Sequence, residues 1–285
     1  QYELIEKIRS YDPTADEALL NRAYVYAMRM HGAQKRASGD PYFAHPIEVA
    51  GILTDYRLDT ASIVTALLHD VIEDTAVTSR EIKGLFGSEI GELVEGVTKL
   101  SRLELNSEHT RQAENLRKFI LAISKDVRVL MVKLADRLHN LQTMSALRAD
   151  KRRRIATETL EIYAPIANRL GLNKIFRELQ DLSFQLIHPL RARVIGRALK
   201  AAHGNRRELL TRIQDNVNVK MTSSGVAAKV FGREKSLYSI YRKMEEKRLS
   251  FSQVLDIYGF RVVVRDIPTC YLALGALHSL YKPVP

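Results

Sequence analysis

Cysteine is almost absent from this sequence. Cys270 is the single thiol among 285 residues, so no disulfide can form within the chain. The same scarcity excludes a zinc site built from clustered cysteines. Because proteins of the reducing cytosol rarely use disulfides, this composition favours a cytoplasmic protein.

Long apolar runs are also missing. No stretch approaches the roughly 20 apolar residues that a membrane-spanning helix needs, so we expect no membrane partner. The first segment, QYELIEKIRSYDP, is charged and amphipathic, unlike a signal peptide. Internal repeats and low-complexity segments are absent. The chain begins on Gln1 and stops after PVP, and we expect both ends to be cuts in a longer protein.

Positive charge, in contrast, is in excess. Lys and Arg number 44 against 33 Asp and Glu, which gives a formal net charge of +11. This balance favours an anionic partner such as a nucleotide, RNA or an acidic protein. A generic basic surface explains the charge equally well, and the run KRRR at 151–154 is more often the solvated start of a helix than an RNA patch.

Apolar residues recur at helical spacing throughout residues 1–188, where clear two-residue alternation is absent. Gly32 suits a helix end, Asp59 or Thr60 a helix start, and Thr78 with Glu81 has the capping-box pattern. We predict an all-helical domain, with helices that include 59–75, 78–100, 109–123, 127–147 and 151–171.

The last third of the chain has a different character. Residues 189–215 form a basic helical stretch that we interpret as a linker. In 216–285, the segments AAKVFGRE and GFRVVVRD are β-branched and flanked by glycine, as strands are, and a helix pattern follows each. We predict a mainly α protein whose C-terminal part begins an α/β domain too short to bury a core alone.

One segment places acids where apolar residues are expected. In TALLHDVIEDTA, residues 65–76, His69, Asp70, Glu73 and Asp74 interrupt the apolar helix pattern. Residues four apart share a helix face, so these side chains form one polar stripe. Burying several carboxylates without a partner is very costly. A divalent cation is a common partner for adjacent histidine and aspartate, whereas an isolated pair of this kind is usually structural.

Two further positions can complete a metal site. His45 begins the helix of YFAHPIEVA, and Asp136 lies in the apolar helix of VKLADRLHNLQTM. With His69 and Asp70 they make a set of two imidazoles and two carboxylates, which suits Mn²⁺, Fe²⁺ or Zn²⁺ and leaves positions open. Glu73 and Asp74 would then orient a water or move its proton. We interpret His139 as a supporting residue rather than a ligand.

Five segments together resemble the HD metal-dependent phosphohydrolases and, more closely, the hydrolase domain of the RelA/SpoT family: HPIEVAGIL, ALLHDVIEDT, LVEGVTKLS, VKLADRLHNLQTM and ETLEIYAPIANRLG. The resemblance covers essentially the whole chain. It implies removal of the 3′-pyrophosphate from ppGpp or pppGpp, which yields GDP or GTP and pyrophosphate.

The resemblance also assigns roles. His45, His69, Asp70 and Asp136 match the family's Mn²⁺ ligands, and Glu73 and Asp74 match the acids that serve the attacking water. The implied substrate contacts are Lys35, Arg36, Ser38, Tyr42, Asn140, Thr143 and Leu147. Because every ligand is kept, the chain resembles the SpoT or bifunctional branch rather than the synthetases whose hydrolase centre is degraded.

FGREKSLYSIYRKM resembles the start of the family's nucleotidyltransferase-like synthetase domain. The residues matched there are Gly232, Arg233 and Lys235, expected on a strand-to-helix turn that suits ATP phosphates, then Ser239, Lys243 and the Mg²⁺-binding carboxylate Asp256. The family's guanine-stacking tyrosine motif and second catalytic glutamate are missing, so we expect no synthesis from this stretch. The loop EEKRLSFSQVLD indicates weak synthesis at full length, and regulatory C-terminal domains could contact a regulatory protein or the ribosome.

Three functions are therefore compared. The first is a Mn²⁺-dependent (p)ppGpp hydrolase, and the second is a synthetase that transfers pyrophosphate from ATP to GDP or GTP. The third is a basic binding or regulatory module with a vestigial metal site. Retention of stoichiometric Mn²⁺ through desalting separates the first from the third.

Overall fold

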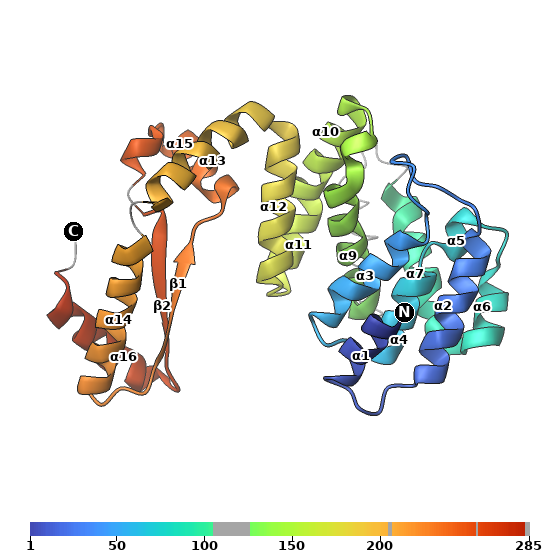
Figure 1. The fold of residues 1–285 in the computed structure, drawn as a ribbon, viewed down its shortest axis with the longest axis horizontal. Helices are drawn as coiled ribbons and strands as arrows, with labels where there is room; N and C mark the ends of the chain where they lie inside the picture. Colours follow the sequence, from blue (N-terminus) through green and yellow to red (C-terminus); the bar gives the residue numbers. More distant parts are fainter. Residues whose placement is uncertain (105–125, 205–206, 255, 283–285) are drawn as a thin grey trace. The chain divides into compact units, whose positions relative to one another are not determined.

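The computed structural model describes residues 1–104, 126–204, 207–254 and 256–282 (Figure 1). The chain divides into two compact units, Gln1–Ser183 and Phe184–Pro285. Each unit has its own hydrophobic core. Among the described residues, no helix is long and apolar enough to cross a membrane.

The first unit is helical in its described part, as the sequence predicts, apart from an isolated antiparallel bridge between Lys35 and Pro41. Its first seven helices are α1 Tyr2–Arg9, α2 Glu17–His31, α3 Ala44–Thr54, α4 Thr60–Leu68, α5 Val71–Asp74, α6 Ser79–Phe86 and α7 Ser88–Glu104. They are followed by α9 Val127–Thr143, α10 Ala149–Glu158, α11 Ala164–Arg169 and α12 Asn173–Ile187. A 3-10 turn, Met144–Ala146, ends α9, and a π turn, Thr159–Tyr163, joins α10 to α11.

The helix starts predicted at Asp59 and Thr78 are confirmed, although the Glu81 carboxylate accepts from the Tyr26 hydroxyl and does not complete the predicted capping box. The Asp59 carboxylate accepts a hydrogen bond from the Ser62 backbone N–H at 3.1 Å, and the Thr78 hydroxyl accepts one from the Glu81 N–H at 3.3 Å. Such side chains satisfy backbone donors that the first helical turn leaves unpaired. Gly32 ends α2 with φ +48°, a conformation that glycine adopts without strain.

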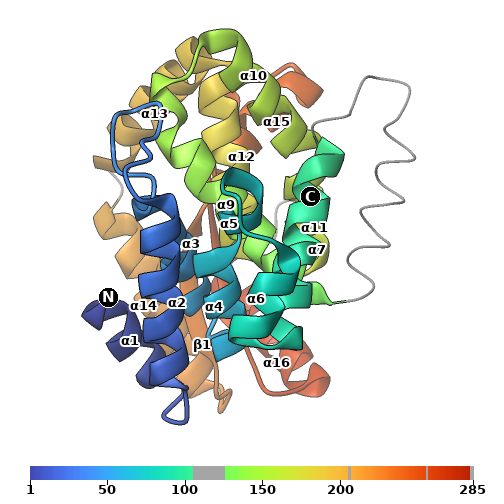
Figure 2. The ribbon, with the colours of Figure 1, turned by 90° about the vertical axis from the view of Figure 1, so that its right-hand side faces the viewer.

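Helix α4 is the centre of this unit. It contacts α2, α3, α7 and α9, and Figure 2 shows it between α2 and α7. Every residue from Ser62 to Leu68 is buried. Full burial of each large apolar side chain contributes about 1.5–3 kcal/mol relative to exposure, so this helix anchors the domain. The end of α4 is therefore a rigid place from which His69 and Asp70 project.

Two predicted helices are broken in the structure. The helix expected over 59–75 ends at Leu68 and restarts at Val71, with His69 and Asp70 in the junction. The helix expected over 78–100 breaks at Gly87, whose φ is +92°. Apolar spacing continues through both junctions, which is why periodicity alone missed them. The predicted helix 109–123 lies outside the described residues.

The second unit combines helices with a two-stranded antiparallel sheet. Its elements are α13 Pro189–Gly204, α14 Arg207–Ser223, β1 Lys229–Glu234, α15 Leu237–Lys247, β2 Tyr258–Val263 and α16 Ile267–Leu280, with a 3-10 turn at Phe251–Gln253. Lys229 pairs with Val263 and Glu234 with Tyr258. Figure 1 shows α14 and α16 beside the strands, and both helices share a hydrophobic cluster with them.

The predicted linker region folds into this second unit. Residues 189–215 fall on α13 and α14 rather than on one helix. Ala192 and Ile195 of α13 pack with Phe184 and Ile240 in one of the unit's two hydrophobic clusters. The unit boundary at 183/184 thus precedes the predicted boundaries at 188 and 215, because these helices bury apolar side chains there. The functional division into hydrolase domain, linker and synthetase domain stays a prediction.

Candidate metal centre

Three side chains converge at the junction between α4 and α5. His45 from the first turn of α3 meets His69 at the end of α4 and Asp70 just after it. One ligand atom from each lies within 4.8 Å of the others. Both histidines are buried, at 1% relative exposure each. A buried group of two imidazoles and a carboxylate is a typical binding site for a transition-metal cation.

The hydrogen bonding of His69 tests whether a cation fits. Its Nδ1 donates to the Ala66 carbonyl at 2.7 Å, which leaves Nε2 directed into the cluster. Nε2 is buried, and no described residue forms a hydrogen bond with it. The Asp70 Oδ2 lies 3.1 Å away. A buried nitrogen that forms no well-aligned hydrogen bond and faces carboxylates is what a metal ligand requires, so the residues fit.

His45 is oriented by a neighbouring histidine. Its Nδ1 lies 2.6 Å from the His139 Nδ1, which also faces the Arg36 Nη1 at 3.3 Å. Burial, His45 and Arg36 together lower the pKa of His139 to about 4, so His139 is neutral and its Nδ1 accepts. His45 therefore donates from Nδ1 and directs Nε2 inward, 3.1 Å from the Asp136 Oδ1 and 3.5 Å from the Asp70 Oδ2. These tautomers follow from the hydrogen-bond network.

Asp136 lies on α9 at the far side of the two imidazoles. Its Oδ1 is 3.9 Å from the His69 Nε2, while its Oδ2 accepts a hydrogen bond from the Lys133 Nζ at 2.9 Å. Burial opposes its charge, but Lys133, together with His45 and His69, holds its pKa well below the usual range. Asp136 is thus an anion beside the other three side chains, and its role as fourth ligand is a proposal.

The electrostatic field of Asp70 and Asp136 at His69 favours cations. Burial lowers the pKa of His69, but the carboxylates of Asp70 and Asp136 outweigh that effect and raise it to about 9. Burial likewise raises the pKa of Asp70, and His69 outweighs it to bring the pKa down to about 2. The interaction that binds a proton to His69 in the metal-free protein also favours a divalent cation in its place.

Tyr42, Glu73 and Asp74 surround the open side of Asp70. The Tyr42 hydroxyl donates to the Asp70 Oδ2 at 2.7 Å and also interacts with the Asp74 carboxylate. Glu73 and Asp74 are exposed at the end of α5. Burial of part of the Glu73 carboxyl, followed by the charge of Asp70, raises its pKa. A carboxylate with a raised pKa is a better proton acceptor near neutral pH.

A cavity of about 370 Å³ lies beside this cluster. All seven residues that the resemblance assigned to the substrate line it: Lys35, Arg36, Ser38, Tyr42, Asn140, Thr143 and Leu147. Arg36 donates to Asn140, and Asn140 donates to Asp136, so two lining residues connect the cavity to the metal cluster. Arg137 and Lys151 also line the cavity and add positive charge to it.

Sequence reasoning missed several contributors. Arg137 lies with its guanidinium 4.3 Å from the Tyr163 ring centroid, at the π turn. Lys133 and Ser101 are buried beside Asp136. Both basic residues belong to the VKLADRL segment, where a charged residue in an amphipathic pattern is normally solvated. The spacing of Lys133 three residues before Asp136, on one helix face, was the available signal.

The predicted synthetase residues are partly gathered in the second unit. Asp256 forms ion pairs with both Lys235 and Lys243, which lower its pKa to about 2. Gly232 and Arg233 lie within β1, paired with Phe260 and Gly259, so only Lys235 occupies the predicted turn. The Ser239 hydroxyl contacts that of Ser236, the cap of α15.

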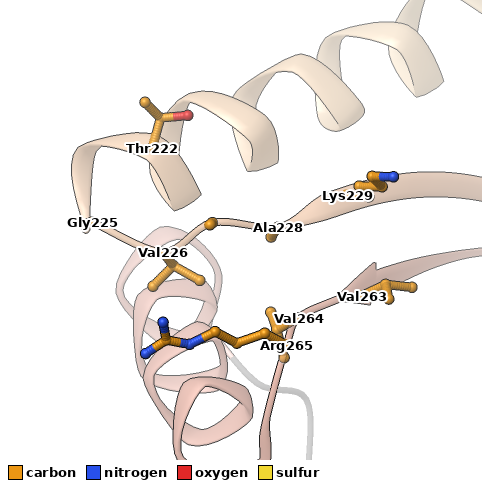
Figure 3. A pocket seen from close by; sticks show the side chains of 9 residues that line it. Thr222, Gly225, Val226, Ala228, Lys229, Val263, Val264 and Arg265 are labelled. Atoms are coloured by element: carbon orange, nitrogen blue, oxygen red, sulfur yellow. The ribbon is translucent and has the colours of Figure 1, made fainter.

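A second cavity, of about 630 Å³, opens at the end of the sheet. Figure 3 shows side chains around it, among them Thr222, Val226, Val263 and Arg265. None of the predicted synthetase residues is among the described residues that line it. The two features are therefore separate.

A helical domain that gathers histidines and aspartates from several helices has the architecture of an HD domain, and residues 23–173 match the family described as "HD domain". Residues 232–285 match the "Region found in RelA / SpoT proteins". The chain belongs to the RelA/SpoT family, with an HD domain followed by a short α/β segment of the synthetase region.

The curated relatives are much longer than this chain. It is 54% identical over 285 residues to the "GTP pyrophosphokinase rsh" of Brucella ovis, covering 100% of this chain and 38% of that protein. It is 49% identical over 282 residues to the "Bifunctional (p)ppGpp synthase/hydrolase SpoT" of Escherichia coli K12, covering 99% and 40% respectively. A solved structure described as "A metazoan ortholog of SpoT hydrolyzes ppGpp and plays a role in starvation responses" is 26% identical, with 63% and 98% coverage and a TM-score of 0.39.

Proposed function

We propose that this chain hydrolyses (p)ppGpp at its 3′-pyrophosphate in a Mn²⁺-dependent reaction that yields GDP or GTP and pyrophosphate. The observation that carries the proposal is the cavity beside the His/Asp cluster, lined by every residue assigned to the substrate. The 49% identical relative in Escherichia coli O157:H7, named guanosine-3′,5′-bis(diphosphate) 3′-pyrophosphohydrolase, supports it.

The cavity side chains suit a nucleotide that carries several phosphates. Lys35, Arg36, Arg137 and Lys151 bring positive charge to its walls, and Met144 and Ile155 supply apolar surface against which a base can pack. Arg36 is held by Asn140 and His139, so its guanidinium is positioned before substrate arrives. A preorganised arginine stabilises charge that develops on phosphoryl oxygens.

His45, His69, Asp70 and Asp136 would hold the cation. Such a cation supplies Lewis-acid stabilisation of a phosphoryl oxygen and lowers the pKa of water. Mn²⁺ is expected from the family resemblance, because the ligand set also suits Fe²⁺ and Zn²⁺. Glu73, at the edge of the cluster, takes the proton from the attacking water, and Asp74 with Tyr42 maintains the polar surroundings of Asp70.

The first test compares wild type, Asp70→Ala and Asp215→Ala for metal content after desalting and for pyrophosphate release from ppGpp. Asp215 is an exposed acid on α14 and serves as the control. We expect Asp70→Ala to lose both metal and turnover while its helical circular dichroism is kept. Normal Mn²⁺ content in Asp70→Ala would overturn the ligand assignment. Metal-loaded wild type without turnover would favour the binding-module alternative.

Glu73→Gln separates proton transfer from metal binding. The change keeps the side-chain shape and removes the base, so we expect metal content to stay normal and kcat to fall by about 10²-fold or more. Loss of metal from this variant would instead make Glu73 a ligand. Single-turnover pyrophosphate release measures the effect.

For the whole protein we also propose a weak synthetase activity that uses Mg²⁺ and ATP. It is supported by the match of residues 232–285 to the RelA/SpoT region. Lys235 and Lys243 occupy both carboxylate oxygens of Asp256, so Mg²⁺ would have to displace an ammonium group there. Contacts with a regulatory protein or the ribosome belong to the same proposal for the longer protein.

A further inference from the structure

A lysine is buried next to the proposed metal centre. Lys133 has 6% relative exposure, and it lies on α9 one turn before Asp136. Its Nζ donates to the Asp136 Oδ2 at 2.9 Å and to the Ser101 Oγ at 2.9 Å. Burying an ammonium group is costly unless it is paired, and among the described residues Asp136 and Ser101 hold this lysine in position.

The first contact determines how Asp136 is presented. Because Lys133 occupies Oδ2, the other oxygen, Oδ1, is the one that faces the Nε2 atoms of His45 and His69. Hydrogen bonds of this kind orient metal ligands in proteins. Lys133 thus leaves Oδ1 of Asp136 directed toward the cation and keeps Oδ2 in a hydrogen bond with its own ammonium group.

The second contact leads to the proposed base. Ser101, on α7, has 8% relative exposure and accepts from Lys133. A hydroxyl that accepts from an ammonium group has its own hydrogen free to donate, and hydrogen bonding from Ser101 is among the effects that lower the pKa of the Glu73 carboxyl on α5. The donors therefore run in one direction, from Lys133 through Ser101 to Glu73.

Lys133 also brings positive charge to the centre. Its ammonium group offsets part of the negative charge of the neighbouring carboxylates, among them Asp136, where a polyphosphate must approach. At short range and low dielectric, negative charge left unpaired would repel the substrate.

We propose that Lys133 and Ser101 are positioning residues of the hydrolase centre: Lys133 orients Asp136 directly and, through the Ser101 hydroxyl, holds the Glu73 carboxylate beside the metal site. This inference rests on the proposed function, in which Asp136 is a ligand and Glu73 is the base. Neither residue is required to touch the substrate.

Ser101→Ala is the central variant, because it removes the link to Glu73 and leaves the Lys133–Asp136 bond in place. We expect kcat for ppGpp to fall by about 10-fold to 100-fold, the range for lost supporting residues, with KM and metal content unchanged. Thr98→Val is the matched control: this buried hydroxyl on the same helix donates only to the Val94 carbonyl, at 3.0 Å, among the described residues. Ser101→Thr, which keeps a hydroxyl, should restore activity.

A double-mutant cycle distinguishes positioning from general damage. If Ser101 acts through Glu73, Ser101→Ala should have no further effect on kcat in the Glu73→Gln background. An additive loss in that background would overturn the proposal. Lys133→Met, which keeps the length of the stem, should reduce kcat more than Ser101→Ala because both contacts disappear.

A second readout does not depend on turnover. The affinity of the full chain for Mn²⁺ reports whether Asp136 is still presented to the cation. We expect Lys133→Met to lower that affinity by about 10-fold to 100-fold, because Asp136 loses the bond that orients it, whereas Thr98→Val should bind as wild type. An unchanged Mn²⁺ affinity in Lys133→Met would refute the positioning role. Wild type that fails to hydrolyse ppGpp would refute the proposed function, and the affinity comparison would still decide this inference.

Discussion

His45 and His69 each use one ring nitrogen for a hydrogen bond within the protein. His69 uses Nδ1 for the Ala66 carbonyl, and His45 uses Nδ1 for His139. Both therefore direct Nε2 toward the same point, where Asp70 and Asp136 bring negative charge. Selectivity for a cation at this site begins with these backbone and side-chain bonds, because they fix which nitrogen is available.

The raised pKa of His69 predicts a pH dependence for the metal-free protein. The folded-state pKa is about 9 against an ordinary value of 6.5. The stabilisation is therefore complete below the ordinary value and is lost as the pH rises through the folded-state pKa. We expect the Tm of the metal-free protein to fall from pH 6.5 to pH 9, as followed by thermal denaturation.

The metal-saturated protein supplies the control, and the sign reverses there. A ligand imidazole must be neutral, so protons compete with the cation and a higher pH favours the bound state. We expect Mn²⁺ to raise the Tm more at pH 9 than at pH 6.5. A Tm of the metal-free protein that rises over this interval would contradict the assignment.

Site residues that interrupt an apolar pattern could be predicted from the sequence, whereas those at positions that look solvent-exposed could not. His45, His69 and Asp70 stand in apolar surroundings, which marks them as buried polar groups, and the structure places them together. Lys133 looks like the solvated position of an amphipathic helix, yet it is buried because Asp136 and Ser101 accept from it. Only the three-dimensional arrangement reveals that partner set.

At the scale of helices, the breaks matter more than the helices themselves. The interruption after Leu68 lets His69 and Asp70 lie in a junction between α4 and α5, while Glu73 follows on a short separate helix. At Gly87, α6 ends and α7 begins, and α7 carries Ser101. Hydrophobic periodicity describes each helix well but continues across such junctions, so the sequence predicted the helical class and missed these breaks.

Gly87 and Gly84 offer a matched pair of tests. Gly87 has φ +92° and Gly84 is exposed inside α6, and an added Cβ meets no atom within 4 Å at either position. The difference between the two alanine variants is therefore conformational. We expect Gly87→Ala to lower the free energy of unfolding by about 1–2 kcal/mol, because alanine is strained there.

The same substitution at Gly84 should have the opposite sign. Alanine has a higher helix propensity than glycine, so we expect Gly84→Ala to raise the free energy of unfolding by up to about 1 kcal/mol. Urea denaturation of both variants in the metal-free protein measures the two effects. Equal effects of the same sign would show that Gly87 is not held in its positive-φ conformation.

At the scale of the whole molecule, the excess of basic residues gives the chain a net charge of +11. Part of that charge lines the cavity beside the metal cluster, through Lys35, Arg36, Arg137 and Lys151. A polyanionic nucleotide is attracted both by the overall charge and by these walls. The local contribution can be separated from the global one by removing single charges.

We expect the KM for ppGpp to increase with KCl while kcat changes little, because salt screens exposed charges over a Debye length of about 10 Å at 0.1 M. Lys151→Ala should raise KM at low salt and weaken its salt dependence. Lys99→Ala changes the net charge equally, and Lys99 is exposed and does not line the cavity, so it should behave as wild type. Equal responses of the two variants would assign the salt effect to net charge alone.

The metal cluster joins parts of the chain that are distant in sequence. His45 and Asp136 are 91 residues apart and meet at 3.1 Å. In polymer terms the centre closes a long loop, whose entropic cost grows only slowly with length. A cation that requires both ends binds the folded chain alone, and at 100 times its Kd it adds about 2.7 kcal/mol of stability. A cation bound in the proposed centre would therefore also stabilise the fold, so we expect its removal to shorten the lifetime of the folded domain.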